Sequence, residues 1–172
     1  MMQKLQRFGG AMFTPVLLFA FSGIILSLSI MFQNEMLVGG IAAEGTIWKN
    51  FWAVVESGGW TVFNQIELLF VIGLPMGLAQ KANARAALES FVVYTTFNNF
   101  LSKILQRMGP TFNVDFTQEV GGNSGLKMIA GTKTLDTNLI GAILIAAIVV
   151  WIHNRYFEKK LPDWIGILQG SS

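Results

Sequence analysis

The sequence contains no cysteine, a single histidine and little charge. Charged residues make up 13% of its 172 residues, whereas a soluble domain carries about 25%. Without cysteine the chain has no thiolate nucleophile, no cysteine-ligated zinc and no disulfide scaffold. One histidine, His153, excludes a multi-histidine metal site within one chain, and a net charge of +2 is too small to indicate a nucleic-acid partner. We therefore expect no metal, no other cofactor and no nucleic acid.

Apolar side chains dominate what is present: they form 52% of the chain, and the mean hydropathy is +0.52. A bilayer core about 30 Å thick needs about 20 apolar residues in a helix. Residues 13–32 form an uncharged run of this length, longer than the roughly 7–15 apolar residues of a signal peptide. Residues 60–79, 86–105 and 135–153 form three further apolar segments that contain some polar residues. The sequence predicts an all-α, polytopic membrane bundle of about four transmembrane helices.

Positively charged loop residues indicate the orientation, because cytoplasmic loops are enriched in lysine and arginine. With the N-terminus inside, the inner segments hold seven such residues, and the outer segments hold five that are spread over longer loops. The seven inner cations are Lys4, Arg7, Lys81, Arg85, Arg155, Lys159 and Lys160. We therefore expect a multi-pass protein with both termini in the cytoplasm.

Each of the two outer loops has its own character. In the first, Trp48, Phe51, Trp52 and Val55 recur at the spacing of one helical face, which predicts a short helix over Trp48–Val55 on the outer surface or against the bundle. The pair Gly58-Gly59 is expected to end this helix. The second loop, over residues 106–134, is rich in glycine and has no regular period. A loop of this length is usually functional, mobile or packed under another element.

Three polar residues near or within the second and third segments are the candidate substrate contacts: Glu67, Asn64 and Asn98. A carboxylate within a membrane is costly and needs a polar partner or water. Asn64 precedes Glu67 by three residues, so on one helix the two would share a face. Two roles are open for these residues. The pattern favours hydrogen bonds that join helices, and the alternative is a polar path for a substrate or a proton.

Other residues in these segments favour packing roles. Gly73 and Gly77, on either side of Pro75, predict close helix packing at a kink. Glu89 lies near the start of its segment, where the helix dipole and interfacial water stabilise a carboxylate. His153 ends the last segment and is expected to reach the headgroups or to bind carbonyls at the helix end. No nucleophile or paired acid accompanies it at an interpretable spacing, so we assign no catalytic residue.

Three stretches carry a resemblance to a known family. They are LQRFGGAMFTPVLLFAFSGI, GGWTVFNQIELLFVIGLPMGLAQKANARAALES and LDTNLIGAILIAAIVVWIHNRYFEKKLPDWIGILQGSS. They resemble the membrane (EIIC) component of a bacterial phosphotransferase-system sugar permease, in the α-glucoside or maltose-type branch of the glucose superfamily. The resemblance covers essentially the whole chain, and HNRYFEKKLPDWIGILQGSS is its most specific part.

The resemblance implies a protein of the bacterial inner membrane that carries a sugar inward while the sugar is phosphorylated. The phosphoryl group would come from a phosphocysteine on a B domain (EIIB), which soluble phosphocarriers such as EIIA supply. The family fold has about ten spans. Its N-terminal half forms a homodimer interface, and its C-terminal half holds most of the sugar site, with the key His and Glu in a His-rich stretch and a GITEP-like motif.

Neither of those motifs occurs in this sequence, nor does a B-domain cysteine. The resemblance therefore implies a partial, truncated EIIC domain over residues 1–172, ending in an amphipathic segment, and none of the family's site residues is carried over to it. Whether such a chain is an enzyme is left open. One alternative is a non-transporting four-span protein that dimerises with a full-length permease or modulates it. Another is a small, self-sufficient carrier whose polar path contains Glu67, Asn64 and Asn98.

Overall fold

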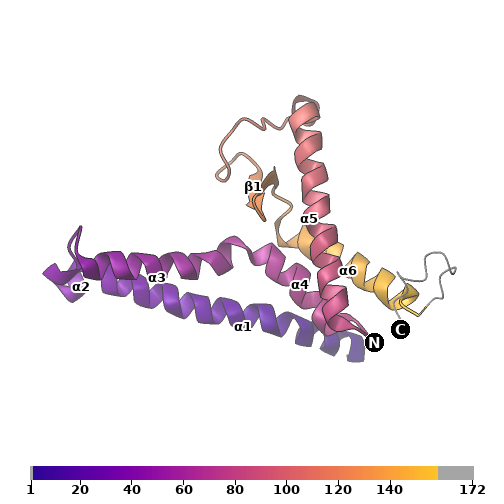
Figure 1. The fold of residues 1–172 in the computed structure, drawn as a ribbon, viewed down its shortest axis with the longest axis horizontal. Coiled ribbons are helices and arrows are strands. Elements are labelled where there is room, and N and C mark those ends of the chain that lie inside the picture. The colour runs from indigo at the N-terminus through magenta and orange to yellow at the C-terminus, as the bar shows by residue number, and fades with distance from the viewer. Residues whose placement is uncertain (1, 159–172) are drawn as a thin grey trace. The chain divides into compact units, whose positions relative to one another are not determined.

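The computed structural model describes residues 2–158, which form two compact units (Figure 1). We call residues 13–66 the hairpin unit, and residues 2–12 together with residues 67–158 the core unit. The amphipathic C-terminal segment expected from the sequence lies outside the described residues. The elements in chain order are α1 (Met2–Gln33), α2 (Glu35–Val38), the 3-10 helix η1 (Gly40–Ala42), α3 (Ile47–Asn64), α4 (Ile66–Leu78), α5 (Asn83–Met108), the 3-10 helix η2 (Gly109–Phe112), β1 (Leu126–Ile129), β2 (Thr132–Leu135) and α6 (Asn138–Tyr156).

In the hairpin unit, α3 runs antiparallel to α1 (Figure 1). Phe32 stacks on Trp52 with ring centroids 4.6 Å apart, and Phe19 lies 5.6 Å from Phe63. Trp48 also packs against Phe32 and donates its indole N–H to the Phe32 carbonyl, at 2.9 Å. The helix predicted over Trp48–Val55 is thus part of a longer helix, and its aromatic face packs against α1.

The expected helix end at Gly58-Gly59 is wrong, because α3 continues through both glycines to Asn64. A Cβ atom added to Gly59 would lie 2.8 Å from Leu26 of α1, whereas one added to Gly58 would meet nothing within 4 Å. Gly59 therefore lets the two helices approach closely, and this packing outweighs the low helix propensity of glycine.

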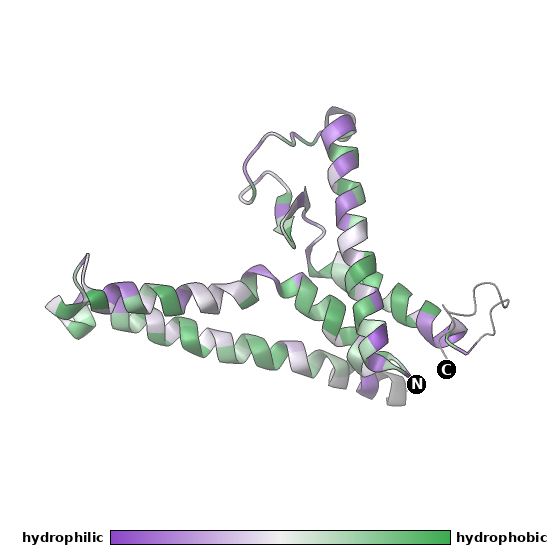
Figure 2. Ribbon diagram, in the orientation of Figure 1, coloured by the Kyte–Doolittle hydropathy of each residue, from purple (hydrophilic) through white to green (hydrophobic). Residues whose placement is uncertain are grey.

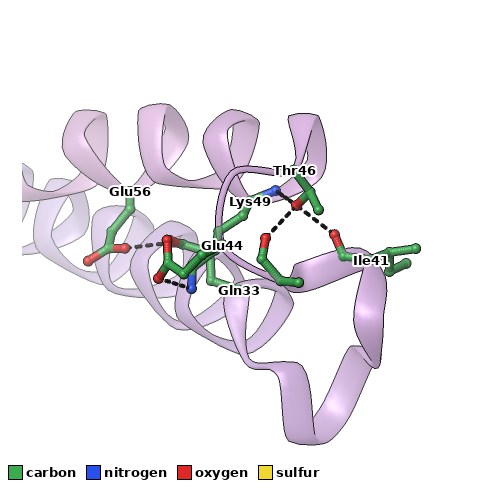
Figure 3. Close-up of polar contacts among 7 residues, drawn as sticks. Gln33, Ile41, Glu44, Thr46, Lys49 and Glu56 are labelled. Atoms are coloured by element: carbon green, nitrogen blue, oxygen red, sulfur yellow. Dashed lines mark hydrogen bonds and ion pairs between the residues drawn. The ribbon is translucent and has the colours of Figure 1, made fainter.

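The turn between α1 and α3 is held by polar contacts (Figure 3). Thr46 caps α3 by accepting from the backbone N–H of Lys49, at 3.2 Å, and its hydroxyl points at the carbonyls of Ile41 and Ala43, both at 2.8 Å. Lys49 also forms an ion pair with Glu44.

Further along α3, Glu56 joins the two helices. One carboxylate oxygen accepts from the Gln33 amide of α1, at 2.7 Å, and the other accepts from the Trp60 indole N–H, at 3.1 Å. Within the described residues, both oxygens of this half-buried carboxylate therefore have a donor.

In the core unit, α4, α5 and α6 surround a small apolar cluster to which the β1–β2 hairpin also contributes. The two antiparallel strands pair Leu126 with Leu135 and Ile129 with Thr132, and β2 packs along α5. Ile129 meets Val71, Tyr94 and Ala142 in this cluster. The long loop expected over residues 106–134 therefore contains a strand and the start of a second one, which pack against the helices.

The described residues contain two helices that are long and apolar enough to cross a membrane, residues 6–33 of α1 and residues 138–156 of α6. A third candidate is the pair α3 and α4, which meets the criterion only as one interrupted span with a break at Gln65. The helix α5 covers the predicted segment 86–105 but does not meet the same criterion. Figure 2 shows why: hydrophobic residues predominate along α1, whereas polar and hydrophobic residues alternate along α5.

The close contact at Gly59 gives a test of the hairpin unit. We expect Gly59→Leu to destabilise the protein by about 1–3 kcal/mol, because the new side chain overpacks the contact with Leu26. The matched change Gly58→Leu points into open space and should be neutral or slightly stabilising. Unfolding in mixed detergent micelles, followed by tryptophan fluorescence, compares the two. Equal stability of both variants would contradict the proposed role of Gly59.

Candidate functional site

The first candidate site centres on Glu67 in the first turn of α4, where its side chain is only 2% exposed. Its carboxylate forms an ion pair with Lys127 of β1, sixty residues further along the chain. The ammonium group keeps some access to solvent, since the Lys127 side chain is 26% exposed. The buried carboxylate thus has the polar partner that its burial requires.

One side of α5 faces this region with polar residues. Ser90, Tyr94, Asn98 and Ser102 recur every four residues, so they share a face of the helix, and all four are buried. We call them the polar face of α5. The Asn98 amide group donates to the Tyr94 carbonyl of the same helix, at 2.8 Å. The Tyr94 hydroxyl faces the side chains of Asn98 and Thr137 without reaching hydrogen-bond geometry.

Several buried oxygen atoms of this region have no hydrogen-bond partner among the described residues. They are Glu67 Oε2, Ser90 Oγ, Tyr94 Oη, Asn98 Oδ1 and Thr134 Oγ1. Leaving a buried polar atom unpaired costs about 1–3 kcal/mol. The interior of the core unit therefore contains several oxygen atoms that can still form hydrogen bonds, in addition to the Glu67–Lys127 ion pair.

The structure brings two of the three predicted candidate residues into the interior of the core unit. Glu67 and Asn98 are both buried, whereas Asn64 is exposed at the end of α3. The expectation that Asn64 and Glu67 share a helical face is wrong, because the helix is interrupted at Gln65 between them. Lys127 was missed, since nothing in the glycine-rich loop indicated a partner for Glu67.

The second candidate site lies around His153 in the last turn of α6. The imidazole is 5% exposed, so the expectation that it reaches the headgroups is wrong. Its Nε2 lies 3.0 Å from the Lys81 carbonyl, and its Nδ1 lies 2.7 Å from a Glu89 carboxylate oxygen. Because a carbonyl oxygen only accepts, Nε2 is the donor in the contact with Lys81.

Asn154 binds the same turn through its backbone. Its side-chain oxygen accepts from the Gln80 N–H, at 2.8 Å, and its amide group donates to the Leu78 carbonyl, at 3.3 Å. His153 and Asn154 together therefore hold three backbone groups of the turn between α4 and α5. We call these contacts the clasp, made by residues 78–89 and residues 153–158.

Charged groups strengthen the clasp from both sides. Arg85 binds the second oxygen of Glu89, at 2.8 Å, and its guanidinium lies 5.8 Å from the centre of the Phe157 ring. Lys81 forms an ion pair with Glu158. The clasp thus joins two stretches that carried the family resemblance, GLAQKANARAALES and HNRYFE. Its side chains bind one another and the backbone, which indicates a role in holding the helices.

Across residues 2–158, no group of three or more histidine, aspartate or glutamate side chains could hold a metal ion. The two sites instead combine single ion pairs with hydrogen bonds between helices, which is the chemistry of assembly and of polar ligand contact.

With this geometry established, comparison with known proteins defines the class. Residues 9–172 match the family described as Phosphotransferase system, EIIC, and the chain belongs to that family. The chain is 62% identical over its whole length to the "PTS system maltose-specific EIICB component" of Bacillus subtilis (strain 168), of which the match covers 33%.

Two further relatives point the same way. An "alpha-glucoside-specific EIICB component" of Leptotrichia buccalis is 56% identical over 99% of the chain and 32% of that protein. The "Phosphotransferase IIC component GlvC" of Escherichia coli (strain K12) is 50% identical over the whole chain and 47% of that protein. The chain thus spans between about a third and about a half of these relatives, and the expected resemblance to the α-glucoside and maltose branch is confirmed.

The Glu67–Lys127 pair gives a test of the first site. We expect Lys127→Met to destabilise the protein by about 3–5 kcal/mol, because it leaves a buried carboxylate without its cation. The double variant Glu67→Gln, Lys127→Met should recover most of this loss. Lys133→Met on β2 is the matched control, since Lys133 binds the Gln118 carbonyl and no buried acid among the described residues. Unfolding in detergent measures all three, and a K127M effect no larger than that of K133M would refute the pairing.

The clasp gives a separate test. Asn154→Ala removes two hydrogen bonds to the α4–α5 turn, each worth about 0.5–1.5 kcal/mol. We expect amide hydrogen exchange in the peptide around Gln80 to become roughly tenfold faster. Asn50→Ala, at an exposed position of α3, serves as the control. Unchanged exchange around Gln80 would show that Asn154 does not hold the turn.

Proposed function

We propose that this chain forms the N-terminal membrane region of a phosphoenolpyruvate-dependent sugar phosphotransferase permease. The permease would take up an α-glucoside such as maltose and phosphorylate it during uptake. The observation that carries the proposal is the 62% identity over the whole chain to a maltose-specific component. The proposed partners are the sugar, the EIIB and EIIA phosphocarrier domains and a second copy of the chain.

Within such a permease, we assign this region to the membrane scaffold, and the phosphoryl-transfer chemistry to the parts of its relatives that the chain does not match. The clasp and the Glu67 site support this assignment, because both join helices and neither presents a nucleophile. We further propose that Glu67 and Asn98 stabilise the core unit instead of contacting the sugar. The Lys127 partner of Glu67 and the backbone contact of Asn98 support that role.

We also propose four membrane spans, near residues 13–32, 60–79, 86–105 and 135–153, in the inner membrane. The arrangement of α5 supports its inclusion, because its polar face is buried while large apolar side chains point outward. These exposed residues are Leu88, Val92, Val93, Phe100 and Ile104. Apolar side chains outside and polar ones inside are what a helix in contact with lipid requires.

The two ends of the described chain support the same topology. Arg7 near the start of α1 and Arg155 near the end of α6 line one groove of the core unit. This proximity supports the proposal that both ends lie on one side of the membrane, with an even number of crossings. If α3 and α4 together cross once, α5 has to cross as well. The larger number of lysine and arginine residues on that side supports its assignment to the cytoplasm.

A chimera tests the proposed function. Residues 1–172 replace the matching region of the B. subtilis maltose-specific component, and uptake and phosphorylation of labelled maltose are measured in cells. We expect both to be retained, and the chain alone to support neither. A chimera that inserts into the membrane but transports no maltose would contradict the proposal, and uptake by the chain alone would favour a self-sufficient carrier. In the chimera, Glu67→Gln with Lys127→Met should leave the KM for maltose unchanged.

A further inference from the structure

A groove of about 480 Å³ lies beside the clasp in the core unit, and neither candidate site explains it. It lies between the first turns of α1, the end of α4 and the second half of α6. Arg7 and Arg155 line its polar part, and Leu78, Val150 and Trp151 line its apolar part. No acidic side chain lines it among the described residues.

The lining residues of α6 form one stripe whose polarity changes along the helix. Ala147, Val150, Trp151, Asn154 and Arg155 follow the spacing of a single helical face. The stripe is apolar for its first three members and polar for its last two, over about 12 Å of helix. This order is that of a membrane–water boundary, because α6 is apolar enough to cross a membrane and ends at Tyr156.

The two arginines leave a positive charge at the polar end of the stripe. Both side chains are exposed, and neither forms an ion pair with another described residue. The neighbouring Gln80 and Asn154 are neutral amides, so they add hydrogen-bonding groups without cancelling the charge. Arginine binds phosphate oxygens through paired N–H groups.

We propose that this groove binds an anionic phospholipid, with its headgroup phosphate between Arg7 and Arg155. One acyl chain then lies along Leu78, Ala147, Val150 and Trp151. A basic pocket between membrane helices at the cytoplasmic boundary is the expected form of such a site. A soluble phosphate compound would use the two arginines but would gain nothing from the apolar wall, which is why the lipid is the assigned occupant.

Lipid retention by the purified 172-residue chain tests this site. The protein in detergent is mixed with phosphatidylglycerol or with phosphatidylcholine of the same acyl chains, and bound lipid is counted by native mass spectrometry. We expect selective retention of phosphatidylglycerol, weakened roughly 25-fold in the double variant Arg7→Gln, Arg155→Gln. The matched control Lys103→Gln, Arg107→Gln removes two exposed cations of α5 outside the groove and should bind like the parent.

Two further measurements identify the ligand as a lipid. Ala147→Trp keeps both arginines but fills the apolar wall, and it should also lose phosphatidylglycerol. Soluble glycerol 3-phosphate should not displace the lipid at millimolar concentration. Arg7→Lys with Arg155→Lys should keep the preference for the anionic lipid, which separates loss of charge from misfolding. Equal retention of the two lipids, or displacement by glycerol 3-phosphate, would overturn the proposal.

Discussion

A polar side chain inside a membrane protein has to find its partner within the protein, because hydrocarbon offers none. The core unit buries polar groups and exposes apolar ones along α5, which buries Asn98 and exposes Phe100. Glu67 is buried and is neutralised by Lys127. Since lipid tails are as apolar as leucine, apolar burial alone favours no particular helix arrangement in a membrane. The specific polar contacts therefore select the fold of this unit.

Two of these contacts lie at opposite ends of α4. The Glu67–Lys127 pair joins the first turn of α4 to β1. Just beyond the C-terminal end of α4, Asn154 and His153 bind the backbone of the segment that leads into α5. At the same end, Gly77 approaches Ala11 so closely that an added Cβ would overlap the Ala11 side chain, which confirms the predicted close helix packing at Gly77. One short helix is thus fixed by contacts that come from three different segments of the chain, β1, α6 and α1.

Sequence reasoning succeeded where one segment carries its own signal. The uncharged run at residues 13–32 lies within α1, and the isolation of Glu67 predicted a polar partner without naming it. Sequence reasoning failed where the outcome depends on a contact with a residue that is distant in the chain. The low helix propensity of Gly58-Gly59 predicted a helix end at this point. The contact between Gly59 and Leu26, which lies on another helix, outweighs that local preference. The two short strands alternate over too few residues to stand out, and the partners of His153 lie on the α4–α5 turn and on α5.

The position of the hairpin limits where Glu67 lies in a membrane. A two-stranded hairpin has unpaired edges, which do not occur in contact with hydrocarbon. Because Lys127 lies on β1 and reaches Glu67, we infer that the first turn of α4 lies at the membrane boundary or inside the protein. The 13 residues of α4 extend about 20 Å, which is less than the roughly 30 Å hydrocarbon core. A crossing at residues 60–79, as proposed, therefore needs length from outside α4 as well.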